Sequence, residues 1–390
     1  MKKKKILVVY PNNFLQGRQG TNNRVFQLIS TFKELNFEID LLGYENFTAD
    51  SSFENFKSQN KDGLINDLFI YDFKKDPKRM NYKILNKLKK IFNRSNGETL
   101  HDWTNEGSKE LFDEITTKNN YDIVILFYSY LANFLTNKNV NYKKIYFMED
   151  SMFLQQYSWD RSNKKITLGK LMDEEINRLE KFDDIFSISY DEKNLYEKLL
   201  EKKIHFLPHL SDKTIKNELI PVNQRKWDIF YIGFNNPFNI EGLNWFLENV
   251  YPHLPSNLRI LLVGSVTDKI EVSYSNVDII QFVPDLNDVL QNVKISICPM
   301  FRGTGMKIKV VDSMEYGLPV VCNERGVDGL PDKTESGCLV TEDPIEFANY
   351  ICKLLNDQEY YAQISNKTKY YYEKNFNKEN YKKELEMKLT

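Results

Sequence analysis

The stretch that decides the fold reads CPMFRGTGMKIKVVDSMEYGLPVVCNERGVDGL and covers residues 298–330. An apolar strand is expected to end at Cys298-Pro299, and a short loop carrying Gly303 and Gly305 leads into a helix. Glycines at such a place let the backbone approach a ligand closely. The N–H groups at the start of a helix, together with the helix dipole, favour a phosphate. The pattern therefore predicts a phosphate-binding loop.

Charged side chains lie next to this loop. Three of them are the cations Arg302, Lys307 and Lys309. Asp312 lies eight residues beyond Thr304, which is roughly 12 Å along a helix at about 1.5 Å per residue. That is the reach from a terminal phosphate to the ribose of a nucleoside diphosphate, where a carboxylate can accept hydrogen bonds from two vicinal hydroxyls. The plainer alternative is a common glycine turn with a solvent ion pair between Lys309 and Asp312.

Strand and helix patterns alternate on both sides of this stretch. In the second half, apolar runs typical of buried strands cover residues 227–233, 258–264, 277–283, 294–299, 319–322 and 337–340. In the first half, they cover residues 5–10, 37–43, 67–73, 121–127, 144–150, 184–189 and 203–208. Helical patterns separate the runs, so we expect an α/β protein with parallel sheets covered on both faces.

A polar segment that carries Pro221 interrupts the alternation and is typical of a linker. The expected organisation is an N-terminal Rossmann-like domain over 1–210, a linker over 211–226, a C-terminal Rossmann-like domain over 227–370, and a C-terminal helix over 371–390 that packs back on the N-terminal domain. Two doubly wound domains in tandem are expected to face a cleft at the carboxyl ends of their sheets, where ligands bind in such folds.

Composition narrows the class of protein. With 53 Lys or Arg and 55 Asp or Glu, the net charge is -2, which argues against nucleic-acid binding by bulk electrostatics. The cysteines form no C-x-x-C pair and are expected to be free thiols of a reducing compartment. No apolar stretch approaches the roughly 18 to 20 residues of a membrane span. The run Ile6 to Val9 is too short for a signal peptide, so we expect a cytoplasmic protein.

The loop and helix, GTGMKIKVVDSMEYGLPVV over 303–321, resemble the donor-binding stretch of the retaining, nucleotide-sugar-dependent glycosyltransferases with the GT-B fold, the "group 1" superfamily. Many members read G-x-G-x-K-x-K-x-x-E-x-x-x-x-G-x-P-V-V there. Looser matches follow the family order at residues 17–42, 147–161, 175–198, 205–212, 231–255 and 283–286. The resemblance implies transfer of a sugar from a nucleoside diphosphate to an acceptor glycan, glycolipid or protein, with retention, in the synthesis of cell-surface polysaccharide or glycoconjugates. It implies that the first domain, over 1–210, is acceptor-binding and that the second, over 227–370, is nucleotide-sugar-binding.

The resemblance also implies how the leaving diphosphate is held. Lys307 would neutralise its charge, assisted by Lys309 or Arg302. The backbone N–H groups that would cradle the diphosphate are those of Gly303, Thr304 and Gly305. Because fixed N–H donors and cations can carry the charge, no metal is expected. The acid pairs Glu149-Asp150 and Asp183-Asp184 are interpreted as helix-capping or turn residues, and no prosthetic group is expected.

The other implied contacts concern the rest of the donor. Asp312 would hold the ribose, and Val283 would meet the nucleobase through its backbone. Gly233 belongs to the predicted glycine loop of the second domain, and Gly20 and Thr21 would lie near the pyrophosphate and donor sugar. Two positions depart from the family: Asp312 stands where Glu is usual, and Thr304 stands where many relatives carry the first acid of a paired E-x7-E motif.

Three further points stay open on sequence grounds. His209 follows Pro208 at the presumed hinge and is expected either in the cleft or in a structural position. The stretch over 73–94 holds nine Lys or Arg with apolar residues at helical spacing. It fits a peripheral contact with the inner face of a membrane, or a solvated helix whose apolar face covers the sheet. The rival functions are a nucleotide-sugar epimerase or hydrolase on the same fold, and a non-catalytic sugar-nucleotide binder.

Overall fold

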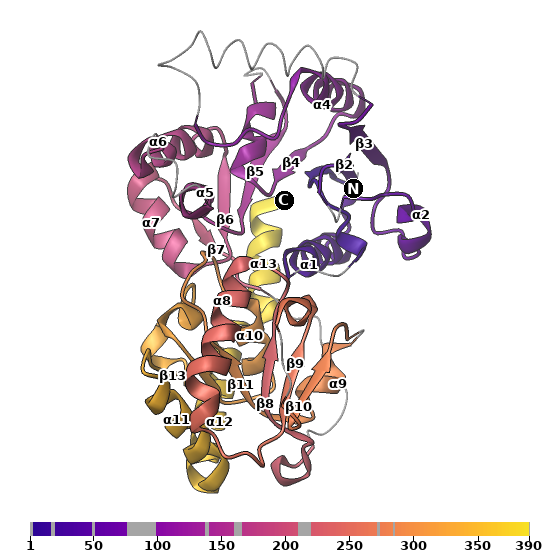
Figure 1. Cartoon of the computed structure of the whole chain (residues 1–390). Coiled ribbons are helices and arrows are strands. Elements are labelled where there is room, and N and C mark those ends of the chain that lie inside the picture. The colour runs from indigo at the N-terminus through magenta and orange to yellow at the C-terminus, as the bar shows by residue number, and fades with distance from the viewer. Residues whose placement is uncertain are drawn as a thin grey trace. The chain divides into compact units, whose positions relative to one another are not determined.

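The computed structural model describes residues 3–16, 20–48, 51–75, 99–136, 140–159, 166–209, 220–270, 274–283 and 285–389. The chain forms two compact units. The first contains residues 1–188, 192–207 and 381–390, and the second contains residues 189–191 and 208–380. Each unit is built around one parallel sheet with helices on its faces (Figure 1). Among the residues described, no helix has the length and apolar character that a membrane crossing requires.

The sheet of the first unit has seven strands in the order β3-β2-β1-β4-β5-β6-β7, all paired in parallel. The strands are β1 Lys5–Val9, β2 Glu38–Glu45, β3 Leu68–Asp72, β4 Ile123–Leu126, β5 Lys143–Met148, β6 Asp184–Ser187 and β7 His205–Phe206. The helices are α1 Gly20–Glu34, α2 Phe56–Gln59, α4 Glu106–Asn119, α5 Met152–Trp159, α6 Leu168–Leu179, α7 Tyr190–Leu200 and α13 Lys378–Leu389. The strand order reverses between β1 and β4, so ligand sites are expected beyond the carboxyl ends of these two strands.

The sheet of the second unit has six strands in the order β10-β9-β8-β11-β12-β13. The strands are β8 Trp227–Ile232, β9 Ile260–Val263, β10 Val277–Ile280, β11 Val293–Cys298, β12 Val320–Cys322 and β13 Leu339–Val340. The helices are α8 Pro237–Trp245, α9 Leu286–Leu290, α10 Ile308–Glu315, α11 Pro344–Asn356 and α12 Gln358–Asn375. Here the order reverses between β8 and β11, and the loops that follow these strands lead into α8 and α10.

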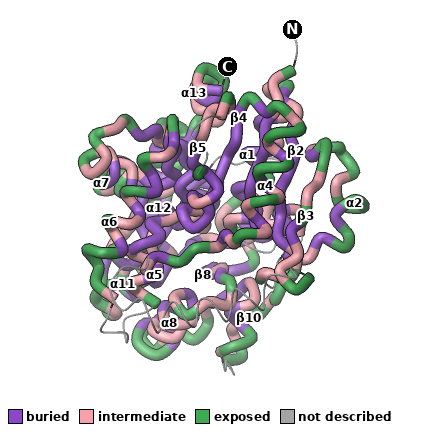
Figure 2. Tube along the Cα trace, turned by 90° about the horizontal axis from the view of Figure 1, so that it is seen from above, coloured by how far each residue is buried: buried purple, intermediate pink, exposed green. Residues whose placement is uncertain are grey.

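Burial explains why the strands read as nearly continuous apolar runs. All four residues of β4 and of β9 are buried, because helices cover both faces of each sheet. Figure 2 shows β4 and β5 as buried strands, whereas α2 and α7 carry exposed stretches. The α/β class with two parallel sheets, predicted from the alternation, is therefore confirmed.

Some expectations need correction or lie beyond the description. The helix expected from about residue 305 begins at Ile308, because two glycines with positive φ precede it. The predicted domain boundaries stay a prediction. Residues 76–98 and 210–219 lie outside the described residues. So do most of the predicted amphipathic stretch 73–94 and most of the predicted linker 211–226.

Candidate active site

The glycine loop lies between the end of β11 and the start of α10, at the switch point of the second sheet. Gly303 has a φ of 105° and Gly305 a φ of 70°, a conformation that side chains with a Cβ rarely adopt. Lys307 occupies the N-cap position of α10. A lysine side chain has no acceptor for the first N–H groups of a helix. The start of α10, next to the predicted loop, therefore suits the binding of an anion.

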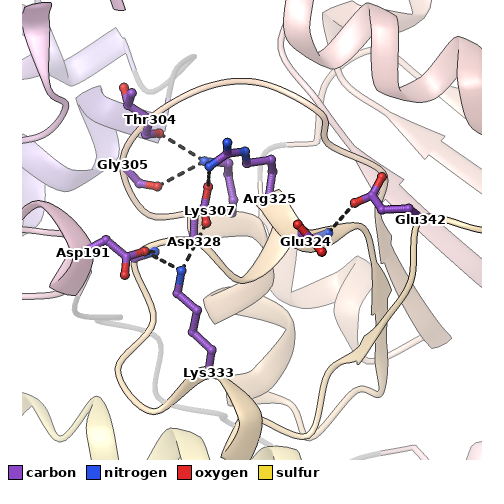
Figure 3. Close-up of polar contacts among 10 residues, drawn as sticks. Asp191, Thr304, Gly305, Lys307, Glu324, Arg325, Asp328, Lys333 and Glu342 are labelled. Atoms are coloured by element: carbon purple, nitrogen blue, oxygen red, sulfur yellow. Dashed lines mark hydrogen bonds and ion pairs between the residues drawn. The ribbon is translucent and has the colours of Figure 1, made fainter. Parts of the chain in front are cut away.

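Lys307 places its charge inside this loop. The side chain is 8% exposed, and its Nζ donates to the carbonyls of Thr304 and Gly305, each at 3.1 Å. Figure 3 shows both contacts. The amino group thus lies at the loop predicted to cradle a diphosphate, where it can neutralise negative charge.

Lys309 is buried and directed elsewhere. Its Nζ donates to Oδ1 of Asn239 at 2.9 Å and lies 4.5 Å from the ring centroid of Tyr231. Burial lowers the pKa of Lys309 to about 8, with nearby Cys298 acting against the shift and Lys307 adding to it. Lys309 therefore joins α10 to the first turns of α8, and its predicted contact with the donor phosphates stays a prediction.

Asp312 lies on α10 beyond the loop, as the spacing predicts, and is 8% exposed. Its Oδ1 lies 3.3 Å from Nε2 of His209, a residue that is itself 3% exposed. Glu315 follows one turn later and is also buried. Tyr372 of α12 forms a hydrogen bond with Glu315, and burial together with the charges of Glu315 and Asp312 raises its pKa well above the ordinary value. The sequence pattern left the position of His209 open, and the structure places it beside the predicted ribose carboxylate.

Two glycines bring α8 and its preceding loop close to this site. A Cβ on Gly242 would lie 1.7 Å from the carbonyl oxygen of Pro299, which opens the phosphate loop. A Cβ on Gly233 would lie 2.9 Å from the hydroxyl of Tyr231. At both positions the backbone lies close to other atoms. Packing therefore explains the glycine at position 233, in addition to its predicted place in a donor-binding loop.

A second loop supports the back of the phosphate loop. The backbone N–H of Gly329 donates to Oδ2 of Asp191 at 2.9 Å. Lys333 pairs with Asp191 at 2.6 Å and with Asp328 at 3.2 Å (Figure 3). A Cβ on Gly329 would lie 2.9 Å from Cα of Met306, the residue before Lys307. Nothing in the sequence pattern had marked Asp191 or Lys333, which lie far apart along the chain.

The remaining predicted residues have less defined surroundings. Arg302 pairs with Glu241 at 3.3 Å, and both side chains are more than a third exposed. Val283 is half-buried and packs on an apolar cluster that includes residues of β8, β9 and α9. Gly20 and Thr21 lie in the first turn of α1, in the first unit. Their predicted roles toward the donor stay predictions.

The carboxyl edge of the first sheet carries a buried ion pair. Nε of Arg24 on α1 lies 3.7 Å from Oε1 of Glu149, which follows β5, and the guanidinium also donates to the carbonyl of Leu207. The interpretation of Glu149 as a capping or turn residue is therefore wrong, because its side chain lies toward Arg24. The carboxylate of Asp183 accepts from the backbone N–H of Lys144 in β5, which is a long-range contact and not a local turn or cap. Over the described part of the chain, no group of three His, Cys, Asp or Glu could hold a metal ion.

Glu149 should make the stability of the fold pH-dependent. Burial raises its pKa from 4.5 to about 7; Arg24 opposes this shift and Asp150 adds to it. The folded state then binds more protons than the unfolded state between these values, so stability falls as pH rises from about 4.5 through 7. We expect the melting temperature of Glu149→Gln to fall less between pH 5 and pH 8 than that of the wild type.

The measurement is a series of thermal melts across that pH range. Near pH 5 the wild-type carboxyl is largely protonated and resembles glutamine in charge, so the two proteins should differ least there, and the slope with pH is the informative quantity. Glu54→Gln, at an exposed glutamate of the same unit, is the control and should follow the wild-type slope. Parallel pH profiles for wild type and Glu149→Gln would contradict the raised pKa.

Comparisons with known proteins show which families and folds the chain resembles. Residues 226–357, which include the glycine loop, match the family described as Glycosyl transferases group 1. A 44.6 kDa protein in the cps region of Klebsiella pneumoniae is 23% identical over 274 residues, which cover 63% of this chain and 68% of that protein.

Solved structures share the fold over nearly the whole chain. Sucrose-phosphate synthase from Thermosynechococcus elongatus has a TM-score of 0.69 at 15% identity, covering 99% of this chain and 98% of that one. HepE from Anabaena, in complex with UDP and glucose, has a TM-score of 0.68 at 13% identity, covering 99% of both chains. TarM from S. aureus has a TM-score of 0.67 at 12% identity, covering 100% of this chain and 99% of that one.

The fold and the glycine loop together define a class. The chain has the two-sheet α/β architecture of the GT-B glycosyltransferases. Within the second unit, residues 226–357 match the family described as Glycosyl transferases group 1, and this match supports a transferase. The resemblance inferred from residues 303–321 is confirmed to this extent.

Proposed function

We propose that the protein transfers a sugar from a nucleoside-diphosphate sugar to an acceptor glycan, glycolipid or protein, with retention at the anomeric carbon. The observation that carries this proposal is the position of Lys307 within the glycine loop at the start of α10, inside the segment that matches the group 1 family. Two similar structures of HepE contain UDP, one of them with glucose, and a third contains UDP-glucose. These support a nucleoside-diphosphate sugar, with uridine as the first base to test.

The chemistry depends on the leaving group. Cleavage of the bond between the sugar and the diphosphate develops negative charge on the β-phosphate. The backbone N–H groups of Gly303, Thr304 and Gly305 and the amino group of Lys307 would stabilise this charge. One such fixed donor is typically worth about 3 to 4 kcal/mol in the transition state. Retention would follow from attack on the same face of the sugar, assisted by the departing phosphate, as the family resemblance implies.

In this proposal, the acceptor is a glycan, glycolipid or protein of the cell surface. The support is the relative in the cps region of Klebsiella pneumoniae and the similarity to TarM, one structure of which contains an α-GlcNAc-glycerol. The predicted peripheral membrane contact through residues 73–94 stays a prediction from the sequence, because residues 76–98 lie outside the described part of the chain.

A turnover assay tests the proposed reaction. The purified protein is incubated with UDP-, GDP-, ADP- and dTDP-sugars, with and without an extract that contains glycan and lipid-linked acceptors, and the release of nucleoside diphosphate is measured. Release that needs the extract supports a transferase. Release or isomerisation of the donor alone would instead support a hydrolase or an epimerase, and binding without any turnover would support a sugar-nucleotide binder.

The ribose assignment of Asp312 makes a separate prediction. Asp312→Asn should weaken the binding of the nucleoside diphosphate by about 1 to 3 kcal/mol, because a hydrogen bond to a charged acceptor is lost or weakened. Isothermal calorimetry measures this change. Asp288→Asn, at an exposed acid on α9 of the same unit, is the control. An unchanged affinity in Asp312→Asn would remove the ribose role.

A further inference from the structure

His209 and Asp312 form a buried contact that the proposed function does not yet use. The two residues are far apart in sequence, yet Nε2 of His209 lies 3.3 Å from Oδ1 of Asp312. The side chains are 3% and 11% exposed. This distance is only slightly longer than the usual N–H to O hydrogen bond of about 2.7 to 3.2 Å. A small rotation of either side chain would therefore make a hydrogen bond between them.

The neighbouring side chains leave His209 as a suitable hydrogen-bond partner for the Asp312 carboxylate. Two other residues near Asp312, Glu315 and Tyr372, couple to each other through a hydrogen bond. The cation on the same helix, Lys309, donates to Asn239 on α8. Within the described residues, Nδ1 of His209 is buried and has no hydrogen-bond partner. The imidazole therefore contacts Asp312 of α10 through its Nε2, while its Nδ1 is buried.

We propose that His209 is a positioning residue for the ribose of the donor: its imidazole holds the Asp312 carboxylate in the orientation that receives the vicinal hydroxyls. This inference rests on the proposed function, because it assumes that Asp312 binds ribose. It extends that function by adding a residue from the segment after β7, at the point where the chain enters the second unit.

The chemistry explains why a partner is useful at this position. An aspartate is one methylene shorter than the glutamate usual in the family, so its carboxylate must be held closely to meet two hydroxyls. A buried carboxylate also needs hydrogen-bond donors, since burial without them is costly. An imidazole N–H supplies one donor and fixes the plane of the carboxylate.

The experiment compares two nucleotides that differ at the ribose. The probe is whichever of UDP, GDP and ADP binds the wild type most tightly, together with its 2′-deoxy form, and calorimetry gives both dissociation constants. We expect the wild type to prefer the ribonucleotide by roughly tenfold or more, the value of a hydrogen bond to a charged group. In His209→Ala this preference should shrink several-fold, while the affinity for the deoxynucleotide changes little. His209→Gln, which keeps an N–H donor, should recover much of the preference.

Two further variants separate positioning from a structural effect. The double variant His209→Ala with Asp312→Asn should bind the ribonucleotide no more weakly than Asp312→Asn alone, because both changes remove the same interaction. His253→Ala, at an exposed histidine of the same unit, should leave both affinities unchanged, and melting curves check that each variant folds.

The results of these binding measurements distinguish the positioning role of His209 from the proposed function. An equal loss of affinity for both nucleotides in His209→Ala, or an unchanged preference, overturns the positioning role while the proposed function stands. If the wild type binds none of the nucleoside diphosphates, the proposed function fails and the inference about His209 fails with it.

Discussion

Replacing Lys307 by alanine should lower the turnover number by about two to three orders of magnitude while the protein remains folded. The amino group lies inside the glycine loop, bonded to the carbonyls of Thr304 and Gly305. A cation fixed at that place acts on charge that develops only in the transition state, so its removal lowers the rate more than it lowers ground-state binding. The loss of two neutral-acceptor hydrogen bonds should cost the fold only about 1 kcal/mol each.

Steady-state kinetics with the donor found by the turnover assay measures this effect, and thermal melts measure the cost to the fold. Lys307→Met is a matched variant that keeps the aliphatic stem and removes the charge, and it should be as slow as the alanine variant. Lys353→Ala removes an exposed lysine of α11 in the same unit and should keep the wild-type rate. A Lys307→Ala protein with near-native kinetics would show that Lys307 does not act on the phosphates.

The elements of the fold were predictable because burial on two faces leaves a simple pattern. The run over 258–264 contains β9, all of whose residues are buried, and the shortness of this apolar run favours a strand over a helix. The glycine loop was predictable for a related reason. Gly303 and Gly305 adopt positive φ values that the sequence marks by residue type alone.

The directions of the side chains were less predictable. The spacing places Lys309 on the first turn of α10, but it does not tell which element lies next to that turn. In the structure, the neighbour is α8, and Lys309 donates to Asn239. The contact of Asp312 with His209 has the same origin, since it joins α10 to a segment about a hundred residues earlier in the chain. Such contacts depend on strand order, which local periodicity does not encode.

The ion pair of Arg24 and Glu149 illustrates the limit in the first unit. Each residue alone reads as an ordinary polar residue, one on a helix and the other after a strand. They meet because β1 and β5 are both neighbours of β4 in a parallel sheet, which brings the start of α1 near the end of β5. A polar residue after a strand can be identified from sequence, but its partner requires the topology.

The substitution Gly242→Ala should strongly destabilise the second unit. A Cβ at this position would lie 1.7 Å from the carbonyl oxygen of Pro299 and 2.9 Å from its carbonyl carbon, and both atoms are backbone. Neither can rotate away, so α8 or the start of the phosphate loop must shift. Overpacking of this kind typically costs about 1 to 3 kcal/mol and sometimes more. We expect about 3 kcal/mol, which lowers the melting temperature by roughly 6 to 12 °C for a unit of this size.

Nucleotide affinity should fall together with the melting temperature in Gly242→Ala, because Pro299 opens the loop that carries Gly303 and Lys307. The matched control is Gly169→Ala on α6 of the first unit, where a Cβ would meet no atom within 4 Å. That substitution should leave the protein as stable as the wild type or more stable by up to about 1 kcal/mol, since alanine favours a helix over glycine. If Gly242→Ala melted like Gly169→Ala and kept its nucleotide affinity, α8 would not need to lie this close to the phosphate loop for the site to form.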